Sequence, residues 1–442
     1  MKGKWSVAAM ILLVVLLFTG CYAFDSDDFY ALPKRSEKYR SLQAAVEEAM
    51  GGGSYSAPVS GANRQTIQQV DLDGDGVEEA LVFCKMDAER PLKVLILKQN
   101  REDYRVICTL EGDGSAFDSV QYAQIDGEPG LEILLSRRIG EQVQQFLSVY
   151  SLKNDTVTEL MSSRYAAFTT LDIDGDQLTD LFLLLANPNG PSAIADLYRF
   201  HDGELQKEAE ASLSMSADSV KRILTGNLAQ DVPAVFVASA YDENNLITDV
   251  FAMGEKGFAN ITRNDESGQS SQTVRNYYVY STDIDNDGLI EMPNTLPLQP
   301  IAGDEGSEGQ YRIVWYNLGV DGARTEKMTT YHNYGEGWFL YLPESWCENL
   351  CVTKVQIGES RSGTEFSTVD ETGNRVVLLT VIAYSGDGAE AQCEQEGRFL
   401  LSNRGDVFFA ALMGEGCTLT REELQARFSF ISLDLLPGEG TN

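Results

Sequence analysis

The 442-residue chain carries 67 acidic and 34 basic side chains, which give a formal net charge of −33 at pH 7. A surface this negative repels a phosphate backbone and argues against nucleic acid as a partner. The length suggests two or three domains, and the presence of only two histidines leaves little scope for a histidine general base.

The N-terminus has the order of a secretory signal. Two lysines precede a mostly apolar run from Trp5 to Phe18, and the small residues Thr19 and Gly20 then lead to Cys21. The cysteine makes the segment resemble a bacterial lipoprotein signal, so residues 1–21 are predicted to hold the signal peptide and the lipidation site, Cys21. The alternative, an uncleaved membrane anchor, is disfavoured because the run is shorter than the roughly 20 residues of a spanning helix. We expect a protein lipid-anchored at the bacterial cell membrane and facing outside the cytoplasm.

Residues 22–61 are predicted to form a small helical leader. Helical spacing over 36–50 places Leu42, Val46 and Met50 on one face, and three glycines at 51–53 end the helix. The expected role of this face is to cap or pack against the domain that follows. A partner-binding helix is the alternative.

Three nine-residue loops then repeat one acidic pattern ahead of an apolar strand. Acids at positions 1, 3, 5 and 9, with a backbone carbonyl at position 7, form the all-oxygen ligand set that Ca²⁺ requires. An EF-hand is excluded, because its bidentate Glu at position 12 is replaced by Val82, Leu183 or Asn294. The predicted calcium ligands are Asp71, Asp73, Asp75, Val77 and Glu79; Asp172, Asp174, Asp176, Leu178 and Asp180; and Asp283, Asp285, Asp287, Leu289 and Glu291.

Two weaker copies complete a series of five. The copy at 124–132 keeps Asp126, Glu128 and Glu132 but contains Pro129, and weak binding or none is expected there. The copy at 227–231 has Ala229 at the third position, which predicts a repeat without metal. The third positions are 53, 48, 55 and 56 residues apart, a period near the length of a propeller blade.

Each repeat also contains four runs of strand-forming residues separated by turn residues. In the first repeat these runs are 66–70, 80–85, 92–98 and 104–110, and in the fifth they are 274–282, 288–294, 311–317 and 326–332. The predicted fold is therefore mainly β, with a five-bladed β-propeller of about 50-residue four-stranded repeats over 62–333.

These loops and strands resemble the FG-GAP or VCBS-type repeat, known from the propellers of integrin α-subunits and from bacterial surface proteins. The resemblance implies that calcium in the loops is structural and that other loops on the propeller face bind a partner, here a protein or a glycan. Seven blades are commoner in that family than five, so closure of the ring is left open.

A different domain, of α+β type, is predicted over 334–442. A strand at 337–346 is stopped by Pro343, further strands are expected at 352–357, 366–369, 376–383 and 407–413, and a capping box at Thr420–Glu423 begins a helix. The order is similar to the PsbP/Mog1-like domains of other bacterial lipoproteins. Trp338, Tyr341 and Trp346 are expected in the core, with an exposed binding patch as the alternative.

The cysteines do not have the spacing of a zinc site. Cys84 and Cys108 are expected as buried free thiols, because the predicted strands place them two strand spacings apart. Connectivity stays open for Cys347, Cys351, Cys393 and Cys417.

No nucleophile elbow, zinc-protease helix or phosphate-binding loop is present in the sequence. A binding or scaffolding role is therefore predicted. The alternative is a hydrolase or lyase that acts on polysaccharide through carboxylates in the propeller channel, which requires two acids outside the calcium loops in one pocket.

Overall fold

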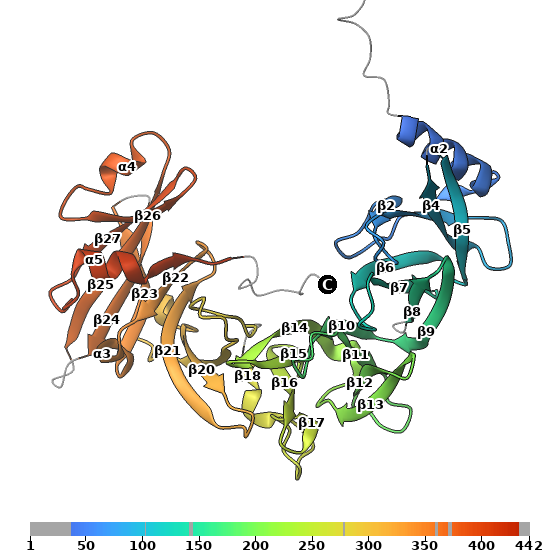
Figure 1. Cartoon of the computed structure of the whole chain (residues 1–442). Coiled ribbons are helices and arrows are strands. Elements are labelled where there is room, and N and C mark those ends of the chain that lie inside the picture. The colour runs from blue at the N-terminus through green and yellow to red at the C-terminus, as the bar shows by residue number, and fades with distance from the viewer. Residues whose placement is uncertain are drawn as a thin grey trace, which may run out of the picture.

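The computed structural model describes residues 37–101, 103–140, 145–276, 279–358, 361–369 and 374–432. Over these residues the protein is mainly β, with six antiparallel sheets that follow one another along the chain (Figure 1). The predicted signal region and Cys21 lie outside the described residues. Within the described ranges, no helix combines the length and the apolar character needed to cross a membrane.

The first four sheets share one plan, in which four strands pair with their neighbours in chain order. Two short strands, β1 and β18, are added to the first and the fourth sheet. The strands are β1 (Ser54–Tyr55), β2 (Ile67–Val70), β3 (Glu79–Lys85), β4 (Leu92–Asn100) and β5 (Asp103–Gly112); β6 (Ala116–Ala123), β7 (Glu132–Arg138), β8 (Gln145–Lys153) and β9 (Thr156–Tyr165); β10 (Ala167–Leu171), β11 (Asp180–Leu185), β12 (Ile194–His201) and β13 (Glu204–Ser212); and β14 (Val220–Ala229), β15 (Val232–Ala240), β16 (Asn245–Gly254), β17 (Gly257–Asn260) and β18 (Arg275–Asn276).

The last two sheets are intertwined. The strand order of the fifth sheet is β19-β20-β21-β22-β28, and that of the sixth is β23-β24-β25-β27-β26. The strands of the sixth sheet lie between β22 and β28 in the chain. The predicted domain boundary after residue 333 falls between β21 and β22, which are adjacent strands of one sheet. The elements are β19 (Met292–Pro297), β20 (Tyr311–Leu318), β21 (Arg324–Asn333), β22 (Trp338–Leu342), α3 (Glu344–Cys347), β23 (Leu350–Ile357), β24 (Arg361–Val369), β25 (Arg375–Ser385), α4 (Ala389–Gln392), β26 (Phe399–Arg404), β27 (Val407–Met413), α5 (Arg421–Arg427) and β28 (Phe428–Phe430).

The inner strands are apolar on both faces because each sheet packs between two neighbours. Along β3, Leu81 and Phe83 join a cluster with the second sheet, whereas Val82 and Cys84 point to the opposite face. Alternation of side chains along a strand turns one continuous apolar run into two packed surfaces. Similar clusters join the second sheet to the third, the third to the fourth, the fourth to the fifth and the fifth to the sixth.

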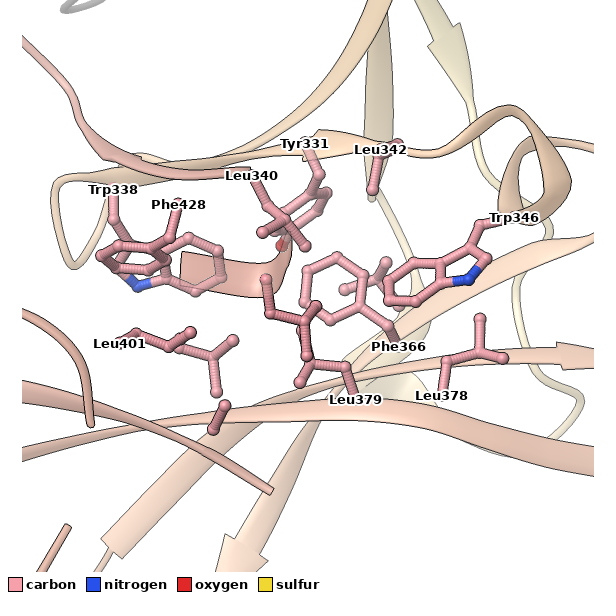
Figure 2. Close-up of a cluster of buried hydrophobic side chains, with 14 of the residues drawn as sticks. Tyr331, Trp338, Leu340, Leu342, Trp346, Phe366, Leu378, Leu379, Leu401 and Phe428 are labelled. Atoms are coloured by element: carbon pink, nitrogen blue, oxygen red, sulfur yellow. The ribbon is translucent and has the colours of Figure 1, made fainter. Parts of the chain in front are cut away.

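Both ends of this stack are covered. Helix α2 (Glu37–Met50), which confirms the helix predicted over 36–50, packs Leu42, Val46 and Met50 on the outer face of the first sheet. At the other end, Figure 2 shows Trp338, Trp346 and Phe366 in the apolar layer between the fifth and the sixth sheet. The two tryptophans are therefore core residues, as predicted.

The structure is mainly β, as predicted, but it is not the predicted five-bladed propeller, and the ring, whose closure the sequence left open, is not closed. In Figure 1 the sheets lie along an open arc, with the first and the fifth sheet far apart. A closed ring requires the free faces of those two sheets to pack on each other, but α2 covers one of them and the sixth sheet covers the other. Four-stranded sheets form in the first four repeats, but the run predicted at 274–282 does not begin the fifth sheet: among the described residues of that run the only strand is β18, which pairs with β16 of the fourth sheet.

The six cysteines among the described residues are all unpaired. Cys84 lies on β3 and Cys108 on β5, on either side of β4. Burial raises the pKa of both thiols, which keeps them in the unreactive protonated form.

Candidate metal centre

Each complete acidic loop is folded around its first carboxylate. Asp71 accepts hydrogen bonds from the backbone N–H groups of Gly74, at 2.9 Å, and of Gly76, at 3.0 Å. Asp172 and Asp283 accept hydrogen bonds from loop N–H groups in the same way. The first acid therefore holds the turn through hydrogen bonds within the loop, which do not depend on a cation.

The loop backbone is left-handed at positions 4 and 6. In the first loop these residues are Gly74 and Gly76, with φ of 71° and 85°. Glycine adopts such angles without strain, which explains the Asp-Gly-Asp-Gly sequence. The third complete loop has Asn286 at position 4, a residue that also tolerates this region, whereas Gln177 at position 6 of the second is an exception.

The acid at position 9 is buried in every complete loop. Glu79 and Glu291 are fully buried and Asp180 is 2% exposed. One oxygen of Glu79 accepts a hydrogen bond from the N–H of Leu72 at 3.0 Å, and the other two acids accept the equivalent bond. Burial raises the pKa of Glu79, and it raises the pKa of Asp180 to about 6, although Arg199 opposes the shift.

The structure brings the acids of positions 1, 3 and 9 together in all three loops. Their oxygens lie within 4.8 Å of one another in the groups Asp71, Asp73 and Glu79; Asp172, Asp174 and Asp180; and Asp283, Asp285 and Glu291. These groups can hold a metal ion. The predicted ligands at position 5, which are Asp75, Asp176 and Asp287, lie outside the groups and accept the N–H of the residue at position 7. The carbonyl role of Val77, Leu178 and Leu289 stays a prediction.

Each group also contacts a basic side chain, which the sequence reasoning missed. Lys98 on β4 forms an ion pair with Asp73, lies 2.8 Å from Asp75 and lies 3.5 Å from Glu79. Burial alone would lower the pKa of Lys98, but the hydrogen bonds and the charges of these acids together raise it. The ammonium group is therefore held in its charged form at the centre of the loop.

Arg199 and Lys327 occupy the equivalent places. Arg199 on β12 pairs with Asp174 and lies 3.2 Å from both Asp176 and Asp180. Lys327 on β21 pairs with Asp287 and lies 3.0 Å from both Asp285 and Glu291.

A signal for two of these bases is present in the sequence. Lys98 and Arg199 both stand 19 residues after the position-9 acid (98 less 79, and 199 less 180). The register Ala80–Leu97 and the pair Leu181–Tyr198 then place each base directly across the hairpin from that acid.

Neither of the two incomplete copies forms such a group of three acids within the described residues. In the copy at 124–132, Gln124 replaces the first acid, and its side-chain oxygen accepts the N–H of Gly127. Lys153 contacts Asp126 at 2.6 Å, but Lys153 is 45% exposed, against 18% for Lys98. The copy at 227–231 holds no acidic group of the kind found in the other loops, within the described ranges.

Neighbouring loops stack on one another along the edge of the arc. A side chain at Gly74 would overlap Pro129 of the next loop, and one at Gly130 would overlap the backbone of Leu72. Further along, the N–H of Thr179 donates to the carbonyl of Gln124 at 2.8 Å. Pro129, which in the sequence weakens the second loop, thus serves as a contact for the first.

The donor set fits a hard divalent cation, although a basic side chain already occupies each group. All donors are carboxylates, and Oε1 of Glu79 is buried without a hydrogen-bond partner, so it has capacity for a ligand. An ion that uses the same oxygens must displace that basic side chain.

No family model matches the sequence, and no curated protein matches it. Among solved structures, the chain is similar to the exotype rhamnogalacturonan lyase YesX at 12% identity, over 80% of this chain and 62% of that one, with a TM-score of 0.29. It is similar to the Bacillus licheniformis rhamnogalacturonan lyase at 14% identity, over 79% and 61%, with a TM-score of 0.29. It is also similar to Sqt1 from Chaetomium thermophilum at 10% identity, over 79% and 99%, with a TM-score of 0.30.

The chain thus spans less than two thirds of the length of the two lyases. At TM-scores this low, none of the three likenesses assigns a family or an activity. The resemblance to FG-GAP or VCBS repeats and to PsbP/Mog1-like domains therefore stays a prediction from the sequence.

Proposed function

We propose that the protein is a binding or scaffolding protein, lipid-anchored at the bacterial cell membrane and facing outside the cytoplasm, whose stacked sheets are stabilised by Ca²⁺ and present a surface to a protein or glycan partner. The observation that carries the proposal is the convergence of three carboxylates in each of three equivalent loops. Lipidation at Cys21 and the location outside the cytoplasm rest on the sequence.

Electrostatics favours a divalent cation in these loops. Four of the five acids of loop 71–79 are at positions 1, 3, 5 and 9, and one base, Lys98, contacts three of these four. A single positive charge leaves most of the mutual repulsion of these carboxylates in place. An ion of charge +2 removes more of it, and calcium accepts the flexible oxygen geometry of such a loop.

Thermal unfolding of the full chain in calcium and in chelator tests the metal. The variant Asp174→Asn removes one converging carboxylate, and we expect it to lower calcium affinity and to abolish part of the calcium-induced rise in Tm. Asp231→Asn in the incomplete copy is the matched control, because Asn tolerates the left-handed φ of 57° at that position. Equal effects of the two changes would contradict the assignment of the loops.

Binding to immobilised glycans and to purified cell-envelope proteins tests the partner role. We expect a saturable ligand whose binding to the full chain weakens in chelator, because calcium stiffens the loops that hold the sheets. A chain that binds no glycan and no envelope protein under either condition would remove the support for this role.

Incorporation of labelled fatty acid tests the anchor. The wild-type chain should be labelled and should sediment with membranes, and Cys21→Ser should abolish both properties. Labelling that persists in Cys21→Ser would show that Cys21 is not the lipidated residue.

An enzyme acting on polysaccharide is the second candidate. Glu111, Asp113 and Glu159 lie outside the acidic loops and line one hollow of about 320 Å³, together with Arg90 and Arg137. Lys93 lowers the pKa of Glu111, which suits a surface ion pair better than a proton donor. Release of unsaturated or reducing ends from acidic polysaccharides, lost in Glu159→Gln, would replace the binding role with this one.

A further inference from the structure

The basic side chains at the loop centres occupy the space that the proposed calcium ion needs. Nζ of Lys98 pairs with Asp73 and lies 3.5 Å from the buried Glu79. These two acids are the ones that the structure groups with Asp71 as a metal-holding set. Positive charge and divalent ion therefore compete for the same oxygens.

Acids and bases occur together along the repeats. The three complete loops each have an enclosed base, and the partial loop at 124–132 has the more exposed Lys153. The copy without converging acids has no such base. There Ala234 pairs with Gly226, the residue before the loop, as the buried acids pair with Val70 and Leu171 in the complete loops. Ala252 stands opposite Ala234, where Lys98 and Arg199 stand in the first and third repeats.

In the first loop, a second feature shows that the base does not saturate its acids, whereas Glu291 of the third loop accepts a hydrogen bond from Lys327 at 3.0 Å and Asp180 of the second accepts one from Arg199 at 3.2 Å. Oε1 of Glu79 is fully buried and accepts no hydrogen bond, although the ammonium group of Lys98 is 3.5 Å away. A buried carboxylate oxygen with this much unused capacity favours a ligand that approaches more closely than the ammonium group does.

We infer that Lys98, Arg199 and Lys327 are affinity-determining residues, which act as built-in counter-ions that hold the loops when calcium is absent and must be displaced when it binds. This inference rests on the proposed calcium site and adds the residues that set its strength. The array stays folded at low calcium, and its calcium affinity is lower than that of the same loops without a base. Each side chain has a route out, because the three residues are 15–20% exposed at the side chain.

The experiment is a calcium titration by calorimetry of the detergent-solubilised full chain and of Lys98→Met, at constant ionic strength. Methionine keeps most of the aliphatic stem of lysine and removes its charge. We expect one site in Lys98→Met to gain at least about tenfold in affinity, because a repelling charge at its centre is gone. Lys93→Met is the matched control, since Lys93 is on the same strand and pairs with Glu111 away from the loop.

A second readout is the Tm in chelator, where Lys98→Met should unfold at a lower temperature than Lys93→Met, and calcium should restore it. The outcomes separate the two proposals. If the wild type binds calcium and Lys98→Met binds it no more tightly than Lys93→Met does, the inference is overturned and the calcium scaffold stands. If only Lys98→Met binds calcium, the inference holds and calcium stabilisation of the wild type fails. If neither chain binds calcium, both are overturned.

Discussion

At the scale of single residues, two buried polar side chains without a full set of hydrogen bonds have different roles. One lies in an acidic loop, and the other lies in the hydrophobic core. Glu79 is buried with an unused oxygen, beside a base and in a group of three acids that could hold a metal ion. His332 is also buried, and neither of its ring nitrogens has a hydrogen-bond partner, but its ring stacks on Phe339 at 5.0 Å between centroids. The first residue has a counter-charge, whereas the second packs against the rings of Trp315, Tyr334 and Phe339, so the second belongs to the core.

The buried imidazole predicts a loss of stability in acid. Burial lowers the pKa of His332 from 6.5 to about 3, so between these values the unfolded chain binds a proton that the folded chain does not. Stability therefore falls as the pH drops below 6.5, by up to about 1.4 kcal/mol per pH unit from this group.

The variant His332→Phe should remove about 2 kcal/mol of the loss in unfolding free energy between about pH 7 and about pH 5, measured by urea denaturation. It sacrifices no hydrogen bond, because the ring nitrogens make none. His201→Gln is the control, since His201 is the only other histidine and is exposed. An unchanged pH profile in His332→Phe would mean that the imidazole takes up its proton as easily in the folded chain as in the unfolded one.

At the scale of elements, the sequence predicted what depends on neighbours in the chain. The strand runs at 80–85 and 92–98 match β3 and β4 within two residues, and the capping box at Thr420 forms as predicted, with Glu423 as its partner. Strand β26 and helix α4 were missed, because each is a short element whose residues show no clear period.

The candidate site was predicted in part for the same reason. The convergence of positions 1, 3 and 9 follows from the loop itself, so the sequence reveals it. The contact of Lys98 depends on the length of the hairpin between β3 and β4, and Lys327 comes from a strand further along. Pairing across strands is a tertiary fact, which a pattern read along nine residues does not contain.

Loop stacking gives an element-scale prediction. Gly74 combines a left-handed backbone with contact to Pro129 of the next loop, whereas Gly76 is left-handed with open space around it. Gly74→Ala should lower the unfolding free energy by about 3 kcal/mol or more, from strain and overlap together, and Gly76→Ala by about 1–2 kcal/mol from strain alone. Equal losses in chemical denaturation would show that the two loops do not press on each other at this point.

At the scale of the whole molecule, the caps explain why an array of four-stranded sheets ends as an open arc. Each inner sheet has both faces buried by its neighbours, and the two end faces are buried by α2 and by the sixth sheet. Repeat arrays that do not close need such terminal caps to stay soluble, because an uncovered end exposes a whole apolar face. The amphipathic face of α2 could be predicted from the sequence. That its packing on the first sheet leaves no free face there for ring closure could not.

Disruption of the N-terminal cap should therefore increase association of the chain. Val46 is fully buried against the first sheet, and Val46→Asp places an unpaired carboxylate there, at a cost of about 3 kcal/mol or more. We expect α2 to detach and expose Val82, Leu95 and Leu97, and we expect light scattering of the detergent-solubilised chain to report oligomers that grow with concentration. Ala44→Asp, which adds the same charge at an exposed position of the same helix, should leave the molecule as it is. If both variants associate to the same extent, the first sheet does not need α2 as a cap, and α2 is not what keeps the arc open at this end.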